Sequence, residues 1–229
     1  MNALALDTAT PALGLSLRSG EDTRTALLQA GFRHSENLLP QVQRLLAEAG
    51  LKPSDLELLV CSLGPGSFTG IRIGLATAKG LVFGARSAGR SCELVGVSTL
   101  EGLAWRFRGF PGAVVPVNAS LRRRYHAAVY LRGKLEGGYL EAELEELRER
   151  LKPHRHLLLT GSGAEALARL LAPEREPEAV ALDSGGFPCD PVGLLERGLE
   201  QFARQGASGE LKPLYLRKSE AEIRRGGGS

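Results

Sequence analysis

Short apolar runs alternate with amphipathic segments along this chain, which predicts an α/β protein. Residues 4–17 read as a strand, a turn around Thr8–Pro11 and a second strand, in which Leu13, Leu15 and Leu17 alternate with small or polar residues. Asp7 lies where the first strand ends. Further strands are predicted at 23–28, 58–60, 92–97, 113–117, 125–131 and 157–160.

The first predicted helix covers 34–50, with Ser35 as a plausible cap and Gly50 as its stop. Pro40 predicts either a start near Asn37 or a kink, because proline is tolerated without loss of a hydrogen bond only in the first turn. His34 is either a capping or partly buried imidazole or a ligand, and the first interpretation is favoured. Other helices are predicted at 70–85, 98–106, 140–151, 164–171 and 191–205. The helix at 98–106 begins with a capping box at 98–101.

A break at 108–112 separates two halves with a similar order of elements, which suggests duplication. The unit at 157–171 repeats, more weakly, the strand, glycine turn and helix at 58–85. We therefore predict a first domain at 1–109. A second, smaller domain at 110–229 is expected to include the C-terminal helix and a flexible tail.

The most informative stretch of the chain is 61–85, which is predicted to run from the end of a strand through a glycine loop into a helix. Gly64, Pro65 and Gly66 impose a tight loop after the strand, and Ser67 or Thr69 is placed to cap the following helix. Two interpretations of this loop compete: a cradle of N–H groups for phosphate, or a plain turn from strand to helix. The loop is not a Walker motif, because no Gly-Lys-Ser/Thr follows the glycines.

The helix after this loop has an apolar stripe beside a seam of small residues, and it pairs in our interpretation with the helix near 38–49. We predict that both form a partner surface, because small residues let another helix approach closely. The alternative is that the seam packs wholly inside its own domain. The residues of this predicted surface are Leu38, Val42, Leu45, Gly70, Ile71, Gly74, Leu75, Ala78 and Val82.

Composition adds little: 43% of residues are hydrophobic, 24% are charged and the net charge is +3, so nucleic-acid contact is permitted but not indicated. Three widely spaced cysteines read as free thiols of a reducing cytoplasm. We expect no signal peptide and no membrane span.

The sequence offers no recognisable catalytic chemistry. The four histidines form neither HExxH nor His-x-x-x-His, so no metal site is predicted. No serine stands in a Gly-x-Ser-x-Gly elbow, and no cysteine lies in a motif with a histidine. We therefore predict no catalytic residues.

The segment Gly64–Gly74, GPGSFTGIRIG, resembles the signature of the TsaB (YeaZ) family, the dimerisation subunit of the bacterial tRNA threonylcarbamoyladenosine complex. His-Ser followed by Leu-Leu-Pro at 34–40 and the ending Pro213–Arg217 are also similar to TsaB, so the resemblance spans nearly the whole chain. It implies two actin-like (ASKHA, ribonuclease-H-like) α/β domains whose mixed sheets are flanked by helices.

The resemblance also implies a non-catalytic subunit that supports a TsaD-like catalytic subunit, with a TsaE-like ATPase in the same assembly and tRNA reached indirectly. The resemblance leaves open whether the chain forms a homodimer when it is alone. No cofactor is expected, except ATP or ADP at a site shared with partners. By the resemblance to actin-like ATPases, nucleotide-binding candidates are Asp7, Thr8, Gly64, Gly66 and Ser67. The alternative for Asp7 is a cap of its own turn.

The second half departs from the family pattern. Asn118-Ala-Ser120 and Arg124-Tyr125 replace the Asp-Ala-Arg and Glu-Val-Tyr of most TsaB sequences, which removes two carboxylates and puts a nucleotide clamp in doubt. Arg122–Arg124 is either a contact for tRNA phosphate or a solvated turn, the second being favoured. Two other functions stay open: an ATP-dependent phosphotransferase or hydrolase that uses Asp7, and a tRNA-binding module.

Overall fold

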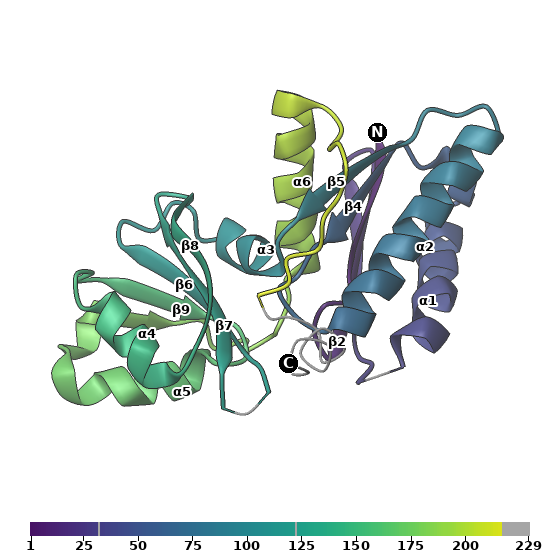
Figure 1. Cartoon of the computed structure of the whole chain (residues 1–229). Helices are drawn as coiled ribbons and strands as arrows, with labels where there is room; N and C mark the ends of the chain where they lie inside the picture. The colour runs from purple at the N-terminus through teal and green to yellow at the C-terminus, as the bar shows by residue number, and fades with distance from the viewer. Residues whose placement is uncertain (32, 122, 217–229) are drawn as a thin grey trace, which may run out of the picture.

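The computed structural model describes residues 1–31, 33–121 and 123–216 and contains two five-stranded mixed sheets flanked by helices, as predicted (Figure 1). The strands of the first sheet are β1 (Asn2–Asp7), β2 (Ala12–Ser19), β3 (Asp22–Gln29), β4 (Leu58–Ser62) and β5 (Glu93–Val97). Their order is β3-β2-β1-β4-β5, with β1, β4 and β5 parallel and the hairpin strands antiparallel.

The second sheet repeats the first in topology. Its strands are β6 (Ala113–Ala119), β7 (Tyr125–Leu131), β8 (Lys134–Ala142), β9 (Leu157–Thr160) and β10 (Val180–Leu182). The order β10-β9-β6-β7-β8 is that of the first sheet read from the other edge, with β6, β9 and β10 parallel. The shared order of elements predicted from the sequence is thus present as a shared strand order.

Helices cover both faces of each sheet. They are α1 (His34–Glu48), α2 (Phe68–Ser87), α3 (Thr99–Trp105), α4 (Leu144–Leu151), α5 (Ala164–Leu171) and α6 (Pro191–Gln205). Three short 3-10 turns lie at Pro53–Asp55, Ala172–Glu174 and Pro177–Ala179. The pair α1 and α2 shares a core with one face of the first sheet, and α4 and α5 share one with the second (Figure 1).

The two inner helices are exchanged between the halves. Leu194 and Leu195 of α6 pack on the first sheet, and Leu100 and Leu103 of α3 pack on the second, while α3 and α6 also contact each other (Figure 1). We expected the C-terminal helix to belong with the second half, and its packing differs. The sequence of α6 shows an apolar face but carries no information about which sheet that face covers.

Other local predictions differ from the structure. Helix α1 begins at His34 and contains Pro40, and Ser35 makes no cap bond because the N-cap position is Arg33. The predicted helix at 140–151 begins only at Leu144, since the three residues before Glu143 end β8, an edge strand that the sequence analysis missed. The adjacent glycines Gly137 and Gly138 and the exposed polar residues of 134–142 hide its strand character.

Helix caps follow the predictions more closely. Ser67 Oγ accepts the Gly70 N–H at 3.1 Å, which makes Ser67 the cap of α2. Ser98 caps α3 through the Leu100 N–H, but Glu101 does not close a capping box; its carboxylate pairs with Arg197 of α6 at 2.6 Å. This ion pair joins the two exchanged helices.

The packing of α2 predicts opposite effects for two glycine substitutions. A Cβ on Gly74 would overlap Thr8 Oγ1 and lie 3.2 Å from Leu6 Cδ1, whereas one on Gly84 would meet nothing within 4 Å. We expect Gly74→Ala to lower the free energy of unfolding by about 1–3 kcal/mol. Gly84→Ala should raise it by up to about 1 kcal/mol, since alanine is the better helix former. Urea unfolding followed by circular dichroism measures both, and equal stabilisation would contradict this packing.

Candidate functional site at the carboxyl ends of the first sheet

Three polar side chains meet where β1 and β4 end. Leu6 pairs with Cys61 in the parallel register of these strands, so the next residues, Asp7 and Ser62, lie side by side at the carboxyl edge. Thr99, the first residue of α3, joins them, with its Oγ1 2.5 Å from Ser62 Oγ. Such an edge is where open α/β sheets place their ligands, which makes it the first place to look for chemistry.

Asp7 is committed to internal hydrogen bonds. Its side chain is buried at 1% exposure, and its Oδ1 accepts the Ala9 N–H at 2.9 Å. The side chains of Thr99 and Ser62 also form hydrogen bonds with it. Burial raises the pKa of Asp7, and these hydrogen bonds oppose that rise. This geometry matches the alternative interpretation, in which Asp7 caps its own turn.

The glycine loop approaches the same turn. The Ser67 N–H donates to Ala9 O at 2.7 Å, and Thr8 Oγ1 donates to Gly70 O at 2.7 Å. A Cβ on Gly66 would overlap Ala9 O, and one on Gly70 would overlap Thr8 O. The space above these glycines therefore holds the chain's own backbone, as in a plain strand-to-helix turn, and not an open cradle.

The five nucleotide-binding candidates are thus brought together in space, since Asp7 and Thr8 face the loop that holds Gly64, Gly66 and Ser67. What the sequence analysis missed is the pair of hydroxyls, Ser62 and Thr99, that completes the hydrogen bonding of Asp7. Ser62 is the last residue of β4, and Thr99 lies two residues after the neighbouring parallel strand β5; these positions were the available signal.

The predicted partner residues of α1 and α2 are buried within the chain. They share one core with the leucines of β1 and β2, apart from Ile71, Gly70 and Gly74, which are buried at the glycine loop and the β1–β2 turn. In this fold they contact the chain itself, which corrects the proposed surface in favour of the packed seam. The residues concerned are Leu38, Val42, Leu45, Gly70, Ile71, Gly74, Leu75, Ala78 and Val82.

The opposite side of this helix pair is exposed, and we call it the outer face. Phe83 is 74% exposed and Leu39 is 49% exposed, which is unusual for large apolar side chains. The residues at the other positions of α2 on this face are small or basic. The outer face consists of Leu39, Thr69, Arg72, Ala76, Gly80 and Phe83.

The second half uses its polar residues in a similar internal way. The Asn118 amide donates to Pro188 O at 2.6 Å, and its Oδ1 accepts the Ser162 N–H at 3.0 Å. The Gly163 N–H donates to Val117 O at 2.9 Å. Asn118 is therefore a structural link between the end of β6, the turn after β9 and the segment before α6.

The predicted basic cluster at 122–124 does not form one surface in the described residues. Arg122 lies outside them. Arg123 is exposed with φ +59°, in the left-handed region. Arg124 donates to Glu141 O and lies within 3.9 Å of Glu143 and 3.8 Å of Glu146, so carboxylates offset its charge.

The remaining candidate groups are buried or scattered. His34 Nε2 lies 2.8 Å from Thr10 O, and burial lowers the pKa of this imidazole, as expected for a buried neutral histidine. Burial raises the pKa of the Cys61 and Cys189 thiols, which therefore stay protonated. Across 1–31, 33–121 and 123–216, no group of His, Cys, Asp or Glu is arranged to hold a metal ion. In the same ranges no helix has the length and apolar character to cross a membrane.

Comparison with known structures defines the class of fold. The chain superposes on an uncharacterized Pseudomonas aeruginosa protein with similarity to peptidase YEAZ, with a TM-score of 0.75, 26% identity and coverage of 94% of this chain and 99% of that one. A Bacteroides thetaiotaomicron protein with an actin-like ATPase fold gives a TM-score of 0.51 at 12% identity, covering 85% of this chain and 95% of that one. The fold is therefore actin-like.

Sequence comparison then defines the family. Residues 29–147 match the family described as TsaD: tRNA N6-adenosine threonylcarbamoyltransferase. The chain is 35% identical over 130 residues to the tRNA threonylcarbamoyladenosine biosynthesis protein TsaB of Escherichia coli K12, covering 56% of this chain and 54% of that relative. An uncharacterized protein of Mycobacterium tuberculosis H37Rv is 34% identical over 96% of this chain and 93% of its own length. The chain belongs to the TsaB (YeaZ) family, although its match spans only about half of the Escherichia coli relative.

The buried carboxyl predicts a pH-dependent effect of Asp7→Asn. Because the pKa of Asp7 in the folded protein is raised above 3.8, the stability contributed by its protonated form is full below that value and is lost as the pH rises through the raised pKa. An Asn amide keeps an acceptor for Ala9 without a buried charge. We expect the stability of Asp7→Asn relative to the unsubstituted protein to increase from about pH 4 to about pH 7.

Urea unfolding across this range measures the difference. Asp22→Asn is the matched control, since the Asp22 side chain is 76% exposed and its substitution should give a difference that is small at every pH. An effect of Asp7→Asn that does not change with pH would show that the buried charge has no cost.

Proposed function

We propose that this chain is a non-catalytic subunit required for formation of N6-threonylcarbamoyladenosine in tRNA. In this role it binds and supports a TsaD-like catalytic subunit, and a TsaE-like ATPase joins the assembly in the cytoplasm. Membership of the TsaB family supports the pathway, since the curated relatives are named as tRNA threonylcarbamoyladenosine biosynthesis proteins. The role within the assembly is inferred from the polar groups of the first sheet.

The observation that carries the proposal is the internal use of those groups. A nucleotide site in this fold needs a solvent-facing carboxylate and free N–H groups in its loops. Here Asp7 is buried, and Ser67 N–H donates to the backbone of the Thr8–Ala9 turn. Asn118 is tied to Ser162 and Pro188. Polar groups that are hydrogen-bonded inside the fold stabilise it, and they are poorly placed to bind a nucleotide for phosphoryl transfer.

The outer face of α1 and α2 is the partner surface that we now propose. An exposed phenylalanine beside small residues gives a helix pair an apolar, closely approachable face, which suits packing against helices of another chain. This keeps the predicted helices and replaces the predicted residues, because the inward stripe is already covered. A TsaD-like subunit is the proposed occupant in the assembly, and a second copy of this chain is the proposed occupant when the partner is missing.

The main alternative is an ATP-dependent phosphotransferase or hydrolase that uses Asp7, and it makes the opposite prediction for turnover. We expect the purified chain to hydrolyse ATP no faster than a buffer blank, with or without Mg²⁺. A coupled phosphate-release assay measures this. Turnover that disappears in Asp7→Ala but persists in Asp22→Ala would overturn the non-catalytic role.

Phe83→Asp tests the partner surface. Because the Phe83 side chain is largely exposed, we expect the melting temperature to change little, while the affinity for the TsaD-like subunit falls about tenfold or more. Leu121→Asp is the matched control: Leu121 is 72% exposed, lies beyond β6 in the second half and should leave affinity unchanged. Equal affinities of the two variants in calorimetric titration would count against the outer face.

A further inference from the structure

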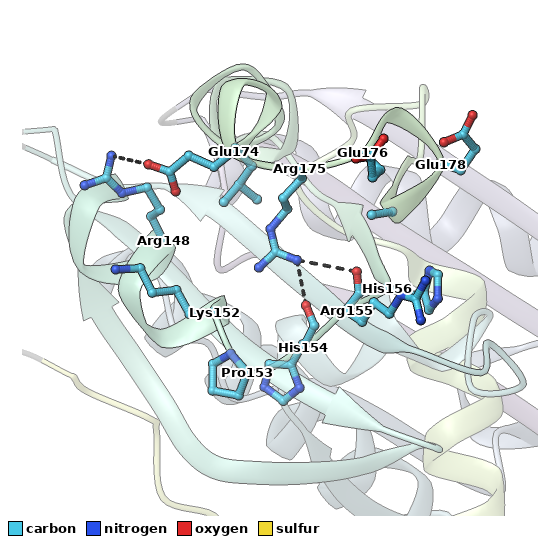
Figure 2. A pocket seen from close by; sticks show the side chains of 12 residues that line it. Arg148, Lys152, Pro153, His154, Arg155, His156, Glu174, Arg175, Glu176 and Glu178 are labelled. Carbon is cyan, nitrogen blue, oxygen red and sulfur yellow. Dashed lines mark hydrogen bonds and ion pairs between the residues drawn. The ribbon is translucent and has the colours of Figure 1, made fainter.

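A cavity of about 650 Å³ lies in the second half, at the amino ends of β9 and β10 (Figure 2). Its walls are the C-terminal end of α4, the segment that enters β9 and the segment that follows α5. Its volume is that of a small-ligand site. Four arginines or lysines and two histidines line it: Arg148, Lys152, His154, Arg155, His156 and Arg175.

Arg175 is the fixed group of this cavity. Its Nη1 donates to His154 O at 2.6 Å and to Arg155 O at 3.5 Å (Figure 2), and its Nη2 donates to Leu151 O at 2.7 Å. Carbonyl oxygens hold the guanidinium in place without neutralising it, and within the described ranges no carboxylate lies within 4.0 Å of it. A guanidinium has five N–H donors, so its Nε–H and one Nη2–H stay available.

The other three cations of the cavity wall differ in how far nearby carboxylates neutralise their charge. Lys152 Nζ lies 2.6 Å from Glu149, and this pair is exposed and therefore weak. Arg155 is exposed and, among the residues the structure describes, has no ion-pair partner. Arg148, in contrast, pairs with Glu174 at 3.3 Å. The uncompensated positive charge of the cavity is therefore centred on Arg175 and Arg155, with Lys152 nearby.

Two carboxylates define what else the occupant must carry. Glu176 and Glu178 line the cavity on the side of Arg155 and His156 (Figure 2). A bare polyphosphate would be repelled there, whereas a ligand with hydroxyl or amino donors beside its anionic group would satisfy both kinds of wall. A nucleotide unit has this combination, because its phosphate suits arginine and its ribose hydroxyls suit carboxylates.

We propose that this cavity binds a backbone phosphate of RNA, with Arg175, Arg155 and Lys152 on the phosphate and Glu176 or Glu178 on the ribose hydroxyls. The site would give this chain a direct RNA contact, which its proposed role as a supporting subunit does not require. RNA is favoured over a free nucleotide because Lys152, Arg155 and His156 of the cavity wall are exposed, so a polymer can extend beyond the cavity.

Charge reversal tests the site with a matched control. In Lys152→Glu/Arg155→Glu, affinity for an unmodified tRNA transcript should fall about tenfold or more, and the slope of log K against log salt should shrink by about 1–2. The control, Lys212→Glu/Arg90→Glu, makes the same charge change at two residues that do not line the cavity and should affect affinity far less. Fluorescence anisotropy of labelled tRNA with the full chain measures both. Arg155→Lys should restore most of the binding lost in Arg155→Ala.

Three results would overturn the proposal: no measurable tRNA binding by the unsubstituted chain, equal losses in the reversal and control variants, or an unchanged salt slope. Titration with AMP separates the two sources of phosphate, since AMP binding that depends on Arg155 while tRNA binding does not would also overturn it. Binding of the TsaD-like subunit, measured on the same variants, should be unaffected. If the unsubstituted chain does not bind the TsaD-like subunit, the proposed function is contradicted, whereas the RNA proposal is judged by the tRNA measurements alone.

Discussion

The close contact between the Thr8–Ala9 turn and the start of α2 is the constraint on which the first half depends. Two backbone carbonyls, Thr8 O and Ala9 O, occupy the space where Cβ atoms of Gly70 and Gly66 would lie. The contact costs helix propensity, about 1 kcal/mol for an interior glycine. In return, the Thr8 hydroxyl and the Ser67 N–H find buried partners, so polar groups that the turn would otherwise leave unsatisfied are paired.

The second half repeats this arrangement with different side chains. Val117 O accepts the Gly163 N–H, and a Cβ on Gly161 would overlap the same carbonyl. In both halves, the end of the first strand is thus held against the glycine turn that follows the fourth strand. The duplicated topology therefore includes a duplicated backbone contact. In each copy this contact fills the space above the glycine turn with the chain's own backbone, which leaves no open cradle of N–H groups for a phosphate there.

The sequence predicts much of this fold because its strongest signals are local. Glycine spacing in α2 indicated a compensating close approach, and Ser67 indicated the cap. It did not reveal that the approaching group is the Thr8 backbone, because an inward seam and an outward seam have the same period. For the same reason the apolar face of α6 did not reveal which sheet it covers. Strand β8 was missed because its exposed residues lack the alternation that burial of one face imposes.

The polar residues of the candidate site illustrate a second limit. Asp7 at the end of a strand is compatible with a ligand or with a capped turn, and only the positions of Ala9, Ser62 and Thr99 distinguish them. Because Asp7, Ser62 and Thr99 hydrogen-bond to groups inside the fold, the surfaces that can contact other molecules lie elsewhere. The helices α1 and α2, which carry the outer face, cover the first sheet (Figure 1), and the basic cavity lies at the C-terminal end of α4 in the second half (Figure 2). Because the two sheets separate these surfaces, a partner on one leaves the other accessible, and under the two proposals above the chain can hold a protein partner and RNA at the same time.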